Sequence, residues 1–197
     1  MEIRENVIEK KVKKQKLPPR TSLIGVSDCT VEDFWAWAYS DILSNRNRAI
    51  FAEFLVAWAL EETTAPRIEW DAVDIHHRGK FIEVKSAAYL QSWKQEKLSA
   101  IRFDIAPKRG WDEKSNTSTD VPVRSADCYV FCLYSETNPK TANVLNIADW
   151  EFYVIKTATL NKLFPNQKSI SLNRLKKLCD PVKYENLKQT IETILEI

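Results

Sequence analysis

The sequence comprises 197 residues, of which 44% are hydrophobic and 28% are charged, with a formal net charge of +2. These values predict one soluble globular domain, and the charge is too close to neutral to mark a nucleic-acid binder by itself. No apolar stretch reaches the roughly 18–20 residues of a membrane helix, and neither the four cysteines nor the adjacent His76 and His77 have the spacing of a zinc site. We therefore expect a cytoplasmic protein with reduced cysteines.

Residues 1–20 are predicted to form a basic extension ahead of a single domain over residues 21–197. The extension carries six basic residues close to Pro18-Pro19: Lys10, Lys11, Lys13, Lys14, Lys16 and Arg20. Such a cluster is either a solvated leader or an arm that adds phosphate contacts.

Two helices are predicted at the start of the domain. The first covers about residues 31–43, and its aromatic residues form no clean stripe, so some are expected to lie exposed at an interface with another chain. The second covers about residues 48–62. Eleven of the twelve residues from 49 to 60 are apolar, so we expect this helix to be buried nearly all round. Glu53 is the exception. It either pairs with an arginine or sits at the rim, or it lies beside a metal ion or a catalytic lysine.

Residues 67–85 predict a β-hairpin that turns at Arg78-Gly79. Glu83 and Lys85 are two residues apart on its second strand, so their side chains point to the same face. The apolar Ile82 and Val84 point to the other face. As an exposed cross-strand pair, Glu83 and Lys85 would contribute well under ~1 kcal/mol, which explains one pair of charges but not the further carboxylates nearby.

The register of this hairpin decides which aspartate faces Glu83 and Lys85. If Arg78-Gly79 is a two-residue turn, Asp74 lies opposite Glu83 and shares its face, whereas Asp71 points to the opposite face. A one-residue bulge would reverse this assignment. The turn also requires Arg78 to adopt a positive φ, which is uncommon for residues other than glycine. Asp74 is therefore the first candidate and Asp71 the second.

The remainder of the chain alternates strands and helices. A polar stretch at 91–99 is a candidate helix, and residues 100–106 alternate as a half-buried strand does. The segment 107–126 has the composition of a loop that is either functional or disordered. Two continuous apolar strands are predicted at 127–136 and 151–156, followed by helices over 157–164, 171–179 and 184–197. This order predicts a mixed α/β sandwich.

Glu53, an upstream aspartate, Glu83 and Lys85 together suit metal-assisted phosphodiester hydrolysis. Carboxylate oxygens are the ligands that Mg²⁺ prefers, and the ion supplies charge neutralisation and an activated water. The lysine can orient that water or stabilise the phosphoryl group. We expect the metal to be Mg²⁺, with Mn²⁺ able to substitute.

The acidic helix residue, the aspartate on the first hairpin strand and the Glu-x-Lys on the second resemble the PD-(D/E)xK nuclease superfamily, which includes many restriction endonucleases. The resemblance covers about residues 46–134 and departs from the motif in that no proline precedes either aspartate. It implies a restriction-endonuclease-like fold, a mixed β-sheet flanked by helices on both faces. Glu53, Asp74 (or Asp71) and Glu83 would be metal ligands, with Lys85 as the catalytic lysine.

The same resemblance implies a Mg²⁺-dependent DNA endonuclease with a role in restriction or defence. Some relatives place a glutamine and an aromatic residue after the Glu-x-Lys strand, so Gln91, with Tyr89 or Trp93, would contact nucleic acid; the alternative is a capped helix start with buried aromatics. Independently of the resemblance, the composition of the long loop makes Lys108 and Arg109 candidates for contacts with nucleic acid. Cleavage of both strands by so small a subunit favours a homodimer. Two alternatives remain open: a nucleic-acid-binding module that does not cleave, and a subunit of a larger complex.

Overall fold

The computed structural model describes residues 14–69, 72–109, 111–112, 117–118 and 121–197. Most of the predicted basic extension and the alternative ligand Asp71 therefore lie outside the described residues. None of the described helices is both long and apolar enough to cross a membrane.

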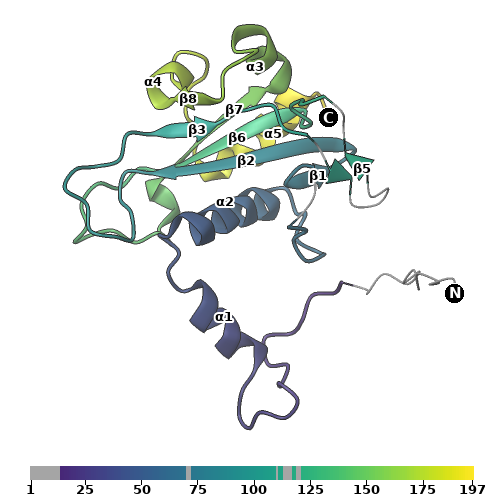
Figure 1. The fold of residues 1–197 in the computed structure, drawn as a ribbon, viewed down its shortest axis with the longest axis vertical. Helices are drawn as coiled ribbons and strands as arrows, with labels where there is room; N and C mark the ends of the chain where they lie inside the picture. Colours follow the sequence, from purple (N-terminus) through teal and green to yellow (C-terminus); the bar gives the residue numbers. More distant parts are fainter. Residues whose placement is uncertain (1–13, 70–71, 110, 113–116, 119–120) are drawn as a thin grey trace, which may run out of the picture.

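A mixed four-stranded sheet forms the centre of the molecule (Figure 1). Its strands lie in the order β1-β2-β6-β7. Strand β2 runs parallel to β6, and the other neighbouring pairs are antiparallel. The strands are β1 (Ile75–His77), β2 (Lys80–Ala88), β6 (Cys128–Tyr134) and β7 (Trp150–Lys156). Every residue of β6 is buried, as its uninterrupted apolar sequence predicted for a strand covered on both faces.

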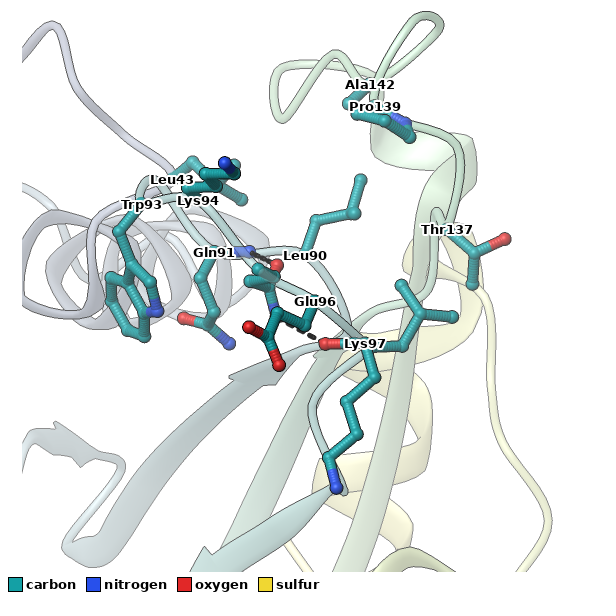
Figure 2. A pocket seen from close by; sticks show the side chains of 12 residues that line it. Leu43, Leu90, Gln91, Trp93, Lys94, Glu96, Lys97, Thr137, Pro139 and Ala142 are labelled. Carbon is teal, nitrogen blue, oxygen red and sulfur yellow. Dashed lines mark hydrogen bonds between the residues drawn. The ribbon is translucent and has the colours of Figure 1, made fainter.

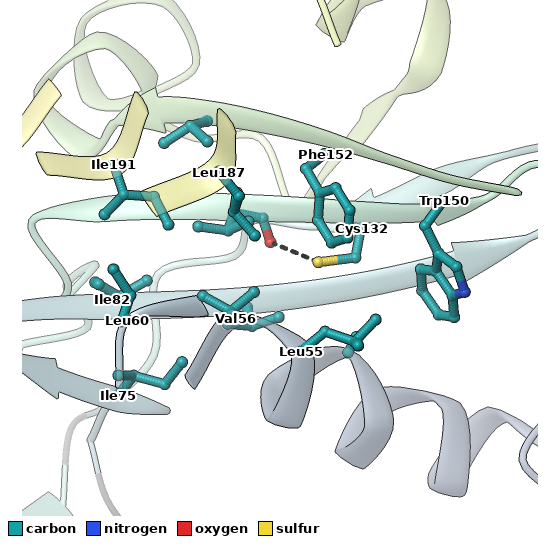
Figure 3. Packing of buried hydrophobic residues seen from close by; sticks show 14 of the residues in the cluster. Leu55, Val56, Leu60, Ile75, Ile82, Cys132, Trp150, Phe152, Leu187 and Ile191 are labelled. Carbon is teal, nitrogen blue, oxygen red and sulfur yellow. Dashed lines mark hydrogen bonds between the residues drawn. The ribbon is translucent and has the colours of Figure 1, made fainter. Parts of the chain in front are cut away.

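One face of this sheet packs against α2 (Asn45–Ala59) and α5 (Leu187–Leu195). Figure 3 shows Val56 on α2 and Leu60, the residue that follows this helix, in one apolar cluster with Ile82 on β2 and Ile191 on α5. Helix α5 follows a 3-10 turn, Tyr184–Asn186, so it begins three residues later than predicted.

The opposite face is covered by α3 (Thr157–Leu163), the short α4 (Leu172–Leu175) and a two-stranded ribbon of β3 (Arg102–Asp104) and β8 (Ser169–Ser171). The predicted strand over 100–106 is thus present, but it pairs with β8 and not with the central sheet. Helices on both faces of a mixed sheet confirm the predicted mixed α/β architecture.

The hairpin between β1 and β2 has the predicted turn and register. Ile75 pairs with Ile82 and His77 with Lys80. Arg78 and Gly79 both have positive φ values, +48° and +78°, as a two-residue turn of type I′ requires. The first strand is shorter than predicted because its ladder begins only at Ile75.

The prediction that α2 is buried nearly all round is wrong. Phe54 and Trp58, one turn apart, are 46% and 59% exposed. The reason is that only one side of α2 faces the sheet, and no other described segment covers the outer side. Helix α1 (Val31–Tyr39), which follows the capping residue Thr30, buries none of its residues and projects away from the sheet (Figure 1). Its exposed aromatics agree with the expectation for this helix, and the homodimer stays a prediction.

Two further segments differ from the sequence-based expectation. Residues 91–99 form bends and no helix. Here the side-chain oxygen of Gln95 accepts a hydrogen bond from the backbone N–H of Gln91 at 2.7 Å, which supports a turn. The segment 107–126 contains a bridge between Lys108 and Val123 and a small ribbon of β4 (Trp111–Asp112) and β5 (Thr117–Ser118).

Candidate active site

A pocket of about 540 Å³ lies between α2, β2 and β3. It opens along the edge of β2 that β1 leaves uncovered. Strand β1 pairs with β2 only as far as Ile82, opposite Ile75, whereas β2 continues to Ala88. Four of the predicted site residues line it: Glu53, Asp74, Lys85 and Gln91. Residues that are far apart in the sequence are therefore brought to one place by the sheet edge.

Glu83 and Lys85 project from β2 to the same face, as predicted from strand periodicity. Their side chains form an ion pair and are only 12% and 19% exposed. The alternating Ile82 and Val84 point into the apolar layer beneath α2. The pair is thus more enclosed than the exposed cross-strand pair that was the alternative interpretation.

Asp74 takes the place of a strand partner at the edge of β2. Its Oδ2 atom accepts a hydrogen bond from the backbone N–H of Val84 at 2.7 Å, and its own N–H donates to the Ile82 carbonyl at 3.2 Å. The chain bends away before Asp74, so the carboxylate reaches the edge without a continued ladder. This position brings Asp74 close to Glu53 below the sheet and to Glu83 and Lys85 above it.

Electrostatics at this edge disfavour ionisation of the two central carboxylates. Burial, followed by the nearby Glu53 carboxylate, raises the pKa of Asp74, against the opposing effects of the Val84 N–H and Lys85. Burial, followed by the charge of Asp74, likewise raises the pKa of Glu83. A cation bound nearby would favour the ionised form of both carboxylates.

Lys85 remains an ammonium ion at neutral pH. Burial alone would lower the pKa of Lys85, but Glu83, Asp74 and Asp104 more than offset this effect, and the pKa is raised overall. Lys85 can therefore donate hydrogen bonds and positive charge to a bound group. It does not have the depressed pKa of a lysine that accepts protons.

Glu53 is engaged by an arginine that the sequence did not single out. Arg67 donates from Nε to one carboxylate oxygen of Glu53 and from Nη2 to the other, the second at 3.0 Å. This is one of the two alternatives that the sequence left open for Glu53. The charge of Glu53 nevertheless acts on Asp74, because both side chains line the same pocket.

The carboxylates are not preassembled around a cation. Across the part of the chain that is described, no three His, Cys, Asp or Glu side chains are grouped so as to hold a metal ion. Glu53 is turned toward Arg67 and Glu83 toward Lys85. The donors still suit Mg²⁺, which commonly takes only one or two carboxylates and completes its shell with water and phosphate. Asp74 and Glu83 could supply these two.

The three predicted nucleic-acid-binding residues lie at or near the pocket. Gln91 lines it and donates to the Ala88 carbonyl at 2.9 Å. Lys108 is exposed, and its Nζ lies 3.3 Å from Asp104 Oδ2 and 3.9 Å from Glu83 Oε1, at the rim of the site. Arg109 follows it and is exposed.

A second pocket, of about 440 Å³, lies on the other side of the segment after β2. Figure 2 shows that it is bounded by this segment and by residues 137–142. It shares Gln91 and Trp93 with the first pocket but contains none of the predicted metal ligands. We therefore place the candidate active site in the first pocket.

Sequence reasoning missed three residues of the site: Arg48, Arg67 and Asp104. The alternation of residues 100–106 carried a signal for Asp104, because it places Arg102 and Asp104 on the polar side of a half-buried strand. Arg48 is the fourth residue of α2 and Arg67 lies in the loop that follows this helix, and neither carried such a periodic signal. No family model, curated protein or solved structure matches the chain.

Proposed function

We propose that this protein is a metal-dependent nuclease that hydrolyses phosphodiester bonds of DNA, with a role in restriction or defence. One observation carries the proposal: Asp74 and Lys85 line one pocket, and Glu83 forms an ion pair with Lys85, so that two enclosed carboxylates with raised pKa values adjoin one ammonium group. Such an arrangement is costly for a protein that has no use for it. The resemblance of Glu53, Asp74, Glu83 and Lys85 to the PD-(D/E)xK pattern, and to its restriction-endonuclease-like fold, gives further support.

Each side chain has a role in this proposal. Asp74 and Glu83 would hold Mg²⁺, and Glu53 would join them directly or through water if Arg67 releases it. When bound, the ion supplies an activated water and neutralises charge at the phosphate. Lys85 would leave its ion pair with Glu83 and donate a hydrogen bond to the attacking water or to a phosphate oxygen. Gln91, Lys108 and Arg109 would orient the DNA.

Incubation of the protein with supercoiled plasmid, linear duplex and single-stranded DNA tests this function directly. We expect products with Mg²⁺ or Mn²⁺ and none with EDTA. Conversion of the plasmid to nicked or linear forms would identify an endonuclease, whereas loss of the linear substrates alone would identify an exonuclease. Cleavage that persists in EDTA, or no cleavage of any substrate with either metal, would contradict the proposal.

A nucleic-acid-binding module that does not cleave is the second candidate. It is favoured by the Glu53–Arg67 pair and by the lack of a preassembled cation site among the described residues. The same incubation discriminates the two, because this candidate requires a gel shift on DNA without any product in Mg²⁺ or Mn²⁺.

Replacing both Lys108 and Arg109 with alanine should weaken DNA binding and its dependence on salt. Each lost phosphate contact removes one released counterion, so the log–log slope of affinity against salt concentration should flatten by nearly two units. Fluorescence anisotropy over a salt series measures this slope. A matched double variant, Lys176→Ala/Lys177→Ala, removes two exposed lysines beyond α4 that do not line the pocket. Equal slopes for the two double variants would show that the 108–109 segment does not contact DNA.

A further inference from the structure

Arg48 is a buried arginine whose positive charge has no carboxylate partner among the residues that the structure describes. It lies in the first turns of α2 and is only 4% exposed. Its Nη1 atom donates to the Leu43 carbonyl at 2.8 Å and to Gln91 Oε1 at 3.4 Å, and its Nη2 atom donates to Asn45 Oδ1 at 2.6 Å. Its Nε atom has no acceptor among the described residues. Burying a charge that is unpaired and incompletely hydrogen-bonded destabilises the folded protein unless a further group, such as a bound anion, compensates for it.

Arg124, the other arginine that is buried in the described part of the chain, has a purely structural role. Arg124 donates from Nε to one backbone carbonyl at 2.7 Å, from Nη2 to two further carbonyls, and from Nη1 to the side chain of Asn161 at 2.7 Å. All three of its nitrogens are therefore satisfied, and it does not line the candidate active site. Arg48 differs from Arg124 in both respects.

Arg48 lies at the positive end of a helix dipole, inside the pocket that holds the carboxylates. Asn45, Arg48, Ala49 and Glu53 from α2 all line that pocket. Their spacing places them along one side of the helix. Arg48 and Glu53 are five residues apart, which is about 7.5 Å along the helix axis. The N-terminus of a helix of this length also favours an anion.

An exposed aromatic ring adjoins this end of the pocket. Trp93 lines the pocket together with Gln91, which accepts the hydrogen bond from Arg48, yet the tryptophan is 54% exposed. Figure 2 shows the Trp93 ring and the Gln91 carboxamide beside one another. Exposed aromatic rings next to a phosphate site are the means by which proteins stack unpaired bases.

We propose that this end of the pocket is a nucleotide subsite, in which Arg48 and the first turn of α2 bind a backbone phosphate and Trp93 stacks the base. A base must leave the duplex stack before it can lie on an aromatic ring. The substrate is therefore a single strand, or a segment that has been splayed open. The proposal rests on the proposed nuclease function, in which the neighbouring carboxylates take part in cleavage. It adds the class of nucleic acid that is cleaved.

Fluorescence anisotropy with the full chain tests the subsite without any cleavage. The protein carries Lys85→Ala, the buffer contains EDTA, and the probe is a short labelled oligodeoxythymidylate without a terminal phosphate. We expect this strand to bind at least about tenfold more tightly than a duplex of equal length. Arg48→Gln should flatten the salt dependence by about one unit, and Trp93→Ala should weaken binding roughly tenfold or more.

Matched variants separate these effects from general changes in charge or surface. Arg46→Gln removes the same charge from the same turn of α2 but from an exposed side chain outside the pocket, and Trp37→Ala removes an 85% exposed ring from α1. Both should bind within about twofold of the parent. An abasic probe should stay sensitive to Arg48→Gln and become insensitive to Trp93→Ala. If Arg48→Gln does not fold, the Arg48 Nε–H resonance of the parent protein should shift on addition of the probe.

Three outcomes would overturn the subsite: equal salt slopes for Arg48→Gln and Arg46→Gln, an Nε–H resonance that does not respond, or binding that occurs only when the probe carries a terminal phosphate. The result is independent of catalysis. A protein that cleaves nothing but shows the expected Arg48 and Trp93 effects would retain the subsite and lose the nuclease function. Metal-dependent cleavage, with binding unaltered in Arg48→Gln and Trp93→Ala, would retain the nuclease function and remove the subsite.

Discussion

Replacing Lys85 with alanine should lower the rate of DNA cleavage by about 10²–10³-fold, the usual loss when one positioned donor is removed from a charge-developing site. Lys85 is held as an ammonium ion by Glu83, Asp74 and Asp104, so its contribution is a hydrogen bond and a positive charge. The initial rate of plasmid nicking in Mg²⁺ measures the effect. Binding of DNA in EDTA should change little, because the substitution removes only one of several cationic side chains that contact phosphates.

Two other variants make this test specific. Lys80→Ala removes a lysine from the same strand outside the pocket and should retain full activity. Lys85→Arg keeps the charge but changes the shape of the donor, so it should recover only part of the rate. Circular dichroism should show that Lys85→Ala is folded, although Glu83 loses its ion-pair partner. Full activity in folded Lys85→Ala would remove Lys85 from the mechanism.

The hairpin was accessible to sequence reasoning because its information is local. An Arg-Gly pair between two short predicted strands indicated the turn, and alternation then assigned Glu83 and Lys85 to one face. The structure has this turn and this register. The departure of the chain before Asp74 was not accessible. In place of a continued ladder the Asp74 side chain accepts a hydrogen bond from the Val84 N–H, and no periodic pattern records such a bond.

The environment of α2 was not accessible in the same way. Its composition predicted burial all round, but composition does not say how many neighbours cover a helix, and Phe54 and Trp58 remain exposed. The partners of its polar residues come from distant segments: Arg67 reaches Glu53, and Gln91 reaches Arg48. Only the packed fold brings these groups together. Sequence patterns thus indicated the carboxylates and the lysine of the candidate site, while the arginines around them are brought there only by the tertiary fold.

Replacing Asp74 with asparagine should abolish metal-dependent cleavage and, in EDTA, raise the melting temperature. The pKa of Asp74 is raised in the folded protein above its ordinary value of 3.8. Between these two values the folded state binds more protons than the unfolded state, so stability falls as pH rises through this window and stays lower above it. Asparagine removes this cost and can still accept the Val84 hydrogen bond. A gain of about 1 kcal/mol would raise the melting temperature by roughly 2–4 °C for a chain of this size.

Thermal melts of both proteins at several pH values, with EDTA and with Mg²⁺, measure these effects. Mg²⁺ should stabilise the parent protein, because a ligand that binds only the folded state raises its stability, and this gain should shrink at acidic pH as protons compete for Asp74 and Glu83. Asp74→Asn should show almost no gain from Mg²⁺, and its advantage in EDTA should disappear as the pH falls toward 3.8. Asp71→Asn, measured in parallel, should behave like the parent. If Asp71→Asn alone lost cleavage and the response to Mg²⁺, Asp71 would be the metal ligand, and the hydrogen bond from Val84 to Asp74 would have only a structural role.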